Sequence, residues 1–244
     1  MKKLLSISFL VVFAAIFGFA KGKYTVNDIG KIVLQNGRLV SVDEYNKSSF
    51  EAVAVVYNIS KDGSYFYGIG VNTIEAPWAT EDSYGYLGRF PGLEGLTDGS
   101  RAFDIIKAID PDGAKDLANN YPALYFAMTY GKRFNVGKFT DGWYIPSFEE
   151  AGNEFKTVCD WKYLGKVIKS FEIFNEWPAY FWCSNSSMQK NGGYDYYLGY
   201  VYPFEKLPKN MKFSQNWKSS WVEGGWDEYY NSTKFNVIVM RKFY

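Results

Sequence analysis

The side chains that could do chemistry in this chain are carboxylates, two cysteines and many aromatic rings, because the chain contains no histidine. Without histidine, Ser-His-Asp and Cys-His catalysis and imidazole-containing zinc sites are excluded. General acid-base work would fall to carboxylates, lysine or tyrosine. We therefore expect a protein that is not an enzyme and that needs neither a cofactor nor a metal.

Two pairs of carboxylates could still serve a glycosidase, a reaction that needs no histidine. Asp110 and Asp112 stand just before Gly113, a composition that is typical of a turn. Glu172 and Glu176 are four residues apart, a spacing that places both on the same face of a helix, where solvent covers them. A carboxylate-dependent hydrolase is therefore the least favoured function.

The two cysteines are Cys159 and Cys183. An even number of cysteines in an exported chain permits one disulfide, and two separately buried thiols fit the sequence equally well. Two thiolates alone would lack the remaining ligands of a metal site.

Aromatic rings gather with two glycines in the segment 214–232. The candidate ligand-binding residues there are Trp217, Trp221, Trp226, Tyr229 and Tyr230. Rings held in a loop can stack on the faces of sugars or peptides, so the expected partner is a glycan or a protein or peptide ligand. The alternative is that these rings pack the segment onto the domain.

The N-terminus has the pattern of a secretory signal peptide. Lys2 and Lys3 precede an apolar run over 4–17, and Gly18-Phe19-Ala20 supplies a cleavage site. The run is shorter than the roughly 20 residues that span a membrane, and no other segment is long and apolar enough. We expect export of residues 21–244 to the periplasm, the cell surface or the medium.

The mature chain is balanced in charge. Removing Lys2 and Lys3 from the 27 basic residues leaves 25, against 26 acidic residues. Nucleic-acid binders usually carry a basic excess, and anionic lipid also attracts basic segments. The expected partners therefore include neither nucleic acid nor a lipid surface.

The first part of the chain has strand patterns. Asn36-Gly37 between β-type residues predicts a hairpin, and the apolar run 52–57 predicts a strand buried on both faces. A turn at 61–63 returns the chain into another strand. Residues 73–100 are rich in glycine, proline and acids, and we expect a long loop there.

The rest alternates helices and strands. Helices are expected over 101–108, from a cap at Asn120 to Gly131, and over 166–174. Strands are expected over 180–184, 194–202 and 235–243. The stretch 141–150, "DGWYIPSFEE", predicts a turn, a short extended segment and a helix start at which Ser147 and Glu150 form a capping box.

Four motifs in this order resemble a family of exported bacterial domains. They are "YPALYFAMTYG" at 121–131, "GWYIPSFEE" at 142–150, "AYFWCSNSS" at 179–187 and "VIVMRKF" at 237–243. The family is similar to the C-terminal domain of the Legionella collagen-like adhesin and includes Bacteroides and Treponema relatives.

The resemblance implies a C-type-lectin-like α+β fold with two to three helices and a loop-rich C-terminal sheet. It further implies one domain over 21–244, with an N-terminal β-hairpin region that forms a β extension over about 28–100. The calcium-and-sugar signature of true C-type lectins is not present in the sequence. The formylglycine-generating enzyme, a relative of that fold, uses a cysteine pair, but Cys159 and Cys183 stand in no matching motif.

The expected function is therefore non-catalytic binding or adhesion by a secreted or cell-surface protein. The alternative is a structural or assembly subunit of a surface appendage. In that case an exposed edge strand, such as the closing run 235–244, would pair with another chain.

Overall fold

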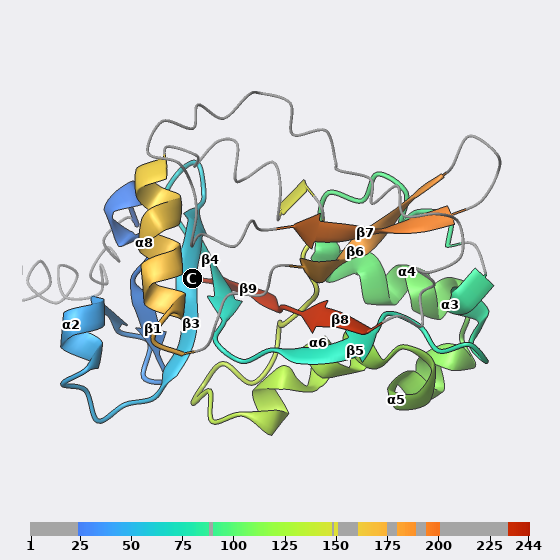
Figure 1. Ribbon diagram of the computed structural model, residues 1–244, viewed down its shortest axis with the longest axis horizontal. Coiled ribbons are helices and arrows are strands. Elements are labelled where there is room, and N and C mark those ends of the chain that lie inside the picture. Colours follow the sequence, from blue (N-terminus) through green and yellow to red (C-terminus); the bar gives the residue numbers. More distant parts are fainter. Residues whose placement is uncertain are drawn as a thin grey trace, which may run out of the picture.

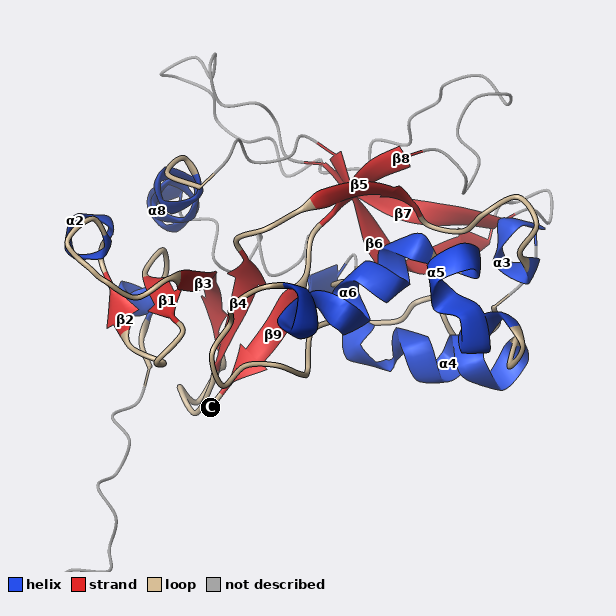
Figure 2. Ribbon diagram, turned by 90° about the horizontal axis from the view of Figure 1, so that it is seen from below, coloured by secondary structure: helices blue, strands red, loops and turns tan. Residues whose placement is uncertain are grey.

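The computed structural model describes residues 24–87, 90–147, 149–150, 161–174, 180–188, 194–200 and 234–244. The predicted signal peptide, Cys159 and the aromatic segment 214–232 lie outside these residues, so the predictions about them remain predictions. The described residues form a mixed α+β fold with two sheets and several helices (Figures 1 and 2).

The first sheet has the strand order β2-β1-β3-β4-β9, and all of its neighbours are antiparallel. Its strands are β1 (Ile32–Leu34), β2 (Leu39–Val40), β3 (Ala52–Ile59), β4 (Phe66–Gly70) and β9 (Met240–Phe243). The predicted hairpin is confirmed, and Gly37 at its tip has a φ of +87°, a conformation that glycine adopts without strain.

Strand β3 is buried on both faces, as its continuous apolar run predicts. Val55 packs in a cluster with Val167 and Phe171 of α8 (Trp161–Phe171), while Val56 belongs to the main core with Phe66. Figure 2 shows α8 beside this sheet. The sheet is thus a middle layer between α8 and the main core.

The second sheet has the order β5-β8-β6-β7. Its strands are β5 (Ile74–Pro77), β6 (Tyr180–Met188), β7 (Tyr194–Tyr200) and β8 (Lys234–Val237). Strands β6 and β8 run parallel, and the other neighbours are antiparallel. The prediction of one closing strand is wrong, because β8 lies inside this sheet while β9 belongs to the first. The buried Ile238 and Val239 connect the two.

Strand β9 ends the first sheet, and its outer side is covered at Met240. Met240 exchanges two backbone hydrogen bonds with Tyr144, at 2.8 and 3.0 Å. Arg241 donates through Nε to the backbone oxygen of Asp141 at 2.6 Å and through Nη1 to that of Lys242 at 3.2 Å. The two Met240 bonds cover one position of this side, so pairing of the closing run 235–244 with another chain stays a prediction.

Among the described residues, the three longest helices confirm three of the predicted ones, with bounds shifted by a few residues. They are α4 (Ala102–Ile109), α6 (Pro122–Arg133) and α8. Short helices add α2 (Val42–Tyr45), α3 (Tyr84–Leu87) and α5 (Leu117–Asn120), with 3-10 turns η1 (Val26–Asp28), η2 (Gly99–Arg101) and η3 (Gly113–Asp116). The expectation of two to three helices was therefore too low. The stretch 73–100 is not one long loop, since it holds β5 and α3.

Helix α6 begins and ends differently from the prediction. Asn120 does not cap it; its Nδ2 donates instead to the backbone oxygen of Asp116 at 2.9 Å, and Pro122 opens the helix. Gly131 does not end the helix. A Cβ at Gly131 would lie 2.2 Å from the backbone oxygen of Thr140, so glycine is there to allow close packing.

Aromatic rings build much of the main core between the helices and the sheets. Trp78, Phe90 and Tyr121 contact one another at centroid distances of 5.8 to 6.1 Å, and Tyr130 lies 4.4 Å from Trp143. All five are at most 5% exposed. A good part of the aromatic content therefore serves packing. In the part of the chain that is described, no helix has the length and hydropathy to cross a membrane.

Candidate functional site

The stretch 141–150 forms the predicted turn, extended segment and capping box. Gly142 has a φ of +75°, and Tyr144 pairs with β9. The backbone nitrogen of Ser147 donates to Glu150 Oε2 at 2.9 Å, and that of Glu150 donates to Ser147 Oγ at 3.1 Å. The capping box is therefore confirmed.

Glu150 is not, however, a solvated acid at a helix start. Its side chain is buried and accepts two more hydrogen bonds, from the backbone nitrogen of Gly99 at 2.8 Å and from the Tyr144 hydroxyl at 2.9 Å. Burial raises the pKa of Glu150 above its ordinary value, although the three donors to its carboxylate favour the charged form. Burial and the neighbouring Glu150 likewise raise the pKa of Tyr144.

This buried cluster joins three parts of the fold. Gly99 opens η2, Ser147 ends the extended segment, and the backbone nitrogen of Ser184 in β6 donates to the oxygen of Pro146 at 2.9 Å. A Cβ on Gly99 would lie 2.2 Å from the backbone oxygen of Ile145, so the segments touch. We interpret the cluster as a structural junction, because the Glu150 carboxylate is enclosed and used by its donors.

The predicted turn at 110–113 is confirmed, and its two acids do not act together. Asp110 accepts from the backbone nitrogen of Gly113 at 3.0 Å and from the Tyr121 hydroxyl. Asp112 is exposed and pairs with Lys115 at 2.7 Å. Of the second pair, Glu172 follows α8, and Glu176 lies outside the described residues.

Cys183 lies in β6 and is completely buried, and its backbone oxygen accepts from Trp78 Nε1 at 3.2 Å. Cys159 lies outside the described residues, so the disulfide stays a prediction. The same holds for the ligand-binding role of Trp217, Trp221, Trp226, Tyr229 and Tyr230.

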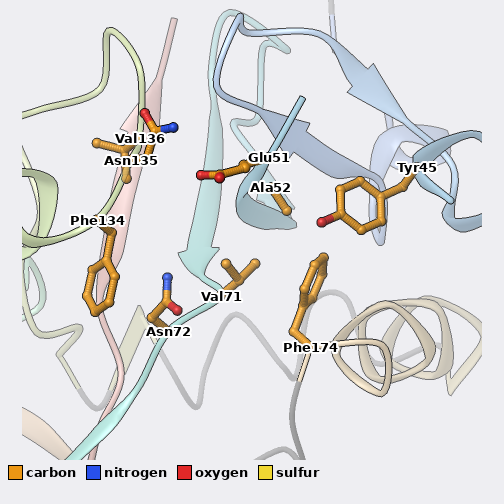
Figure 3. A pocket seen from close by; sticks show the side chains of 9 residues that line it. All are labelled: Tyr45, Glu51, Ala52, Val71, Asn72, Phe134, Asn135, Val136 and Phe174. Carbon is orange, nitrogen blue, oxygen red and sulfur yellow. The ribbon is translucent and has the colours of Figure 1, made fainter. Parts of the chain in front are cut away.

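A pocket of about 230 Å³ opens where five separate segments meet beside the first sheet (Figure 3). The segments are the end of α2, the start of β3 and the residues that follow β4, α6 and α8. They supply its lining residues, namely Tyr45, Glu51, Ala52, Val71, Asn72, Phe134, Asn135, Val136 and Phe174.

Six of the nine lining residues are apolar or aromatic, and polar and apolar groups share the pocket surface about equally. Val71 and Val136 are buried. The rings of Tyr45 and Phe174 meet edge to face at 5.3 Å, and Figure 3 shows them across the pocket from Phe134. The ring contact joins the end of α2 to the residues that follow α8 at one side of the pocket.

Three polar side chains lie between these walls. Asn72 donates through Nδ2 to the Tyr130 hydroxyl at 3.3 Å, which leaves its Oδ1 as an acceptor. Glu51 and Asn135 are exposed, and their side chains make no hydrogen bond or ion pair within the described ranges. No lysine or arginine is among the described residues that line the pocket. The pocket thus holds one unpaired negative charge and a surplus of acceptors.

None of the pocket residues was predicted from the sequence. Each lies at an end of a helix or strand or just beyond it, and their positions run from 45 to 174. No local spacing relates them, because only the packing of β3, β4, α6 and α8 brings them together. The shared feature in the sequence is a polar or aromatic residue near the end of a helix or strand. Such residues are too common to single out a site.

Comparisons with known proteins do not assign the chain to a family. No family model matches it, and no curated protein does. Among solved structures, it is similar to a fimbrial protein from Bacteroides ovatus ATCC 8483, at 12% identity and a TM-score of 0.44. The match covers 88% of this chain and 48% of that one, so this chain spans about half of its length. A likeness this distant establishes neither family nor function.

Proposed function

We propose that this protein is an exported, non-catalytic binding protein of the adhesion type, and that it takes its ligand in the pocket between α2, α8 and the end of α6. The observation that carries this proposal is the pairing of unused polar groups with a formed apolar wall. Glu51 and Asn135 have free hydrogen-bonding capacity beside Val71 and Val136. Ligand sites commonly combine a mostly apolar lining with a few polar groups that fix orientation.

The proposed scaffold is the C-type-lectin-like domain that the sequence motifs resemble. The mixed α+β architecture and the turn, extended segment and capping box at 141–150 are compatible with it. Export is supported by the signal-peptide pattern of residues 1–20.

A role without catalysis is supported by how the carboxylates are used. Glu150 is enclosed by its donors, and Asp110 and Asp112 bind different partners. A glycosidase needs two carboxyl groups that face the same bond. The pocket itself contains only one carboxylate, Glu51, among its lining residues.

The second candidate is a subunit of a surface appendage, and β7 favours it. This strand ends the second sheet, and no strand of the described part pairs with its outer side. Such an edge offers backbone groups to another chain. Size-exclusion chromatography at several concentrations separates the two roles, since a self-assembling subunit shifts to larger species as concentration rises.

Blocking the pocket should abolish binding without unfolding the protein. We expect Asn135→Trp to place a large ring over the pocket and to remove binding to the glycan or peptide that wild-type protein selects on an array. Because Asn135 is exposed and unpaired, the free energy of unfolding should change by no more than about 0.5 kcal/mol.

The matched control is Glu94→Trp, which adds the same ring at an exposed position between α3 and η2. It should bind as wild type does. Full binding by Asn135→Trp, with the same ligands as wild type, would refute the pocket as the site.

A further inference from the structure

We propose that the pocket accepts the ammonium group of a lysine side chain from a protein partner. This inference rests on the proposed function, because it names the ligand of the same pocket. It follows from three properties of the described lining: its charge, its excess of acceptors and its size.

The negative charge of the pocket lining favours a cationic ligand. Glu51 is the only charged residue among those that line the pocket, and it has no ion-pair partner in the described part of the chain. A cation therefore gains an interaction there, and an anion meets repulsion. Aromatic rings add to this preference, since the ring quadrupole attracts an ammonium group. Tyr45, Phe134 and Phe174 supply such rings around the pocket.

The hydrogen-bond acceptors of the lining favour a ligand group that donates hydrogen bonds. The Glu51 carboxylate can only accept, and Asn72 has its Oδ1 left because its Nδ2 is used by Tyr130. Asn135 contributes a further amide oxygen. A lysine ammonium carries three donors and no acceptor, so it complements this set. A neutral sugar also donates, but its hydroxyl groups bring acceptors as well. The lining offers these the second Asn72 N–H, the Asn135 amide nitrogen and the Tyr45 hydroxyl, and none of these donors is charged.

The size of the pocket favours a side chain of a protein over a large free ligand. The volume of about 230 Å³ lies below the roughly 300–1,000 Å³ of pockets for drug-sized molecules. Ala52, Val71 and Val136 can cover the methylene stem of a lysine.

A matched pair of ligands tests the inference by saturation-transfer NMR with the mature protein. Nα-acetyl-lysine amide carries the stem and the ammonium group, and Nα-acetyl-norleucine amide carries the stem without it. We expect the lysine compound to bind and the norleucine compound to bind at least about tenfold more weakly, since hydrogen bonds to charged groups are the stronger ones. Raising the salt from about 0.02 to about 0.5 M should weaken lysine binding severalfold, because salt screens exposed charges.

Two variants place the ligand. Glu51→Gln removes the charge and keeps the shape, and it should weaken lysine binding by about tenfold or more. Glu94→Gln makes the same change of charge elsewhere and should leave binding unchanged. Equal binding of the two ligands, or lysine binding that Glu51→Gln does not reduce, would overturn the inference.

The remaining outcomes separate this inference from the proposed function. If glucose, galactose, mannose or N-acetylglucosamine binds in place of lysine and Asn135→Trp removes that binding, the lysine inference is wrong and the proposed function stands. If Asn135→Trp leaves every binding event intact, including those on the array, both are wrong. If choline binds as tightly as the lysine compound, the pocket recognises a general cation and the assignment to a lysine fails.

Discussion

Trp78→Ala should destabilise the protein by about 3–5 kcal/mol, the usual cost of removing a buried tryptophan. Trp78 is 2% exposed and lies edge to face with Tyr121 at 5.8 Å. Its Nε1 also donates to the backbone oxygen of Cys183 at 3.2 Å, which ties the main core to β6. The substitution would therefore leave a cavity and a buried acceptor that has lost a donor. In a chain of this length, such a loss lowers the melting temperature by about 6–20 °C.

Trp78→Phe separates the two causes, because it keeps most of the ring and removes the donor. We expect a loss of stability between wild type and Trp78→Ala, measured by urea denaturation with circular dichroism. It also provides a measurable variant if Trp78→Ala does not fold. A melting temperature of Trp78→Phe equal to that of wild type, together with a loss below about 1 kcal/mol in Trp78→Ala, would show that Trp78 is not a core residue.

Glu150→Ala should have the next largest effect, with a loss of about 3 kcal/mol or more. The Glu150 carboxylate accepts from Gly99, Ser147 and Tyr144 at 2.8 to 2.9 Å inside the protein. A buried donor that loses its acceptor costs about 1–3 kcal/mol. Ser147→Ala is the control, because it breaks the helix cap and leaves the carboxylate in place, at a cost of about 1 kcal/mol. Equal losses in the two variants would mean that the buried carboxylate adds nothing beyond the cap.

The same residue predicts a pH dependence with a defined sign. Burial raises the folded-state pKa of Glu150 above its ordinary value of 4.5, so the unfolded chain releases this proton first as the pH rises. The part of the stability that is linked to protonation of Glu150 is therefore fully present below pH 4.5 and is lost as the pH rises through the folded-state pKa. The free energy of unfolding of wild type minus that of Glu150→Gln should fall from acidic to neutral pH. A difference that is flat or rises with pH would contradict the raised pKa.

Local patterns predicted much of the fold because local physics decides those parts. The hairpin at Asn36-Gly37 needs a glycine with positive φ, and the capping box of Ser147 and Glu150 satisfies its own backbone donors. The run in β3 is apolar on both sides because α8 and the main core cover both. Each of these features is set within a few residues of its signal.

The features that could not be predicted depend on contacts between distant segments. The closing run divides because its first half, β8, pairs within the second sheet and its second half, β9, pairs within the first. The sequence shows a single apolar stretch and gives no sign of this division. Glu150 has the local pattern of an exposed cap, yet Gly99 and Tyr144 enclose it. The pocket combines Tyr45 with Phe174, and no spacing rule links residues so far apart.

The role of the aromatic residues also could not be predicted from the sequence alone. A surplus of rings is compatible with both a binding surface and a core, and the composition cannot choose between them. In the described residues, Trp78, Tyr121, Tyr130 and Trp143 serve the core. Trp221 and Trp226 lie outside the described residues, and their role in ligand binding stays a prediction from the sequence.

The central claim is that ligand binds in the pocket, and backbone chemical-shift mapping tests it most directly. The ¹⁵N-labelled mature protein would be titrated with the compound that binds most tightly on the glycan and peptide array. We predict that the largest shift changes fall on Glu51, Ala52, Asn72 and Asn135, and that Glu51→Gln reduces them. Shift changes that leave these four residues untouched and gather instead at Trp217, Trp221 and Trp226 would contradict the pocket and favour the aromatic segment.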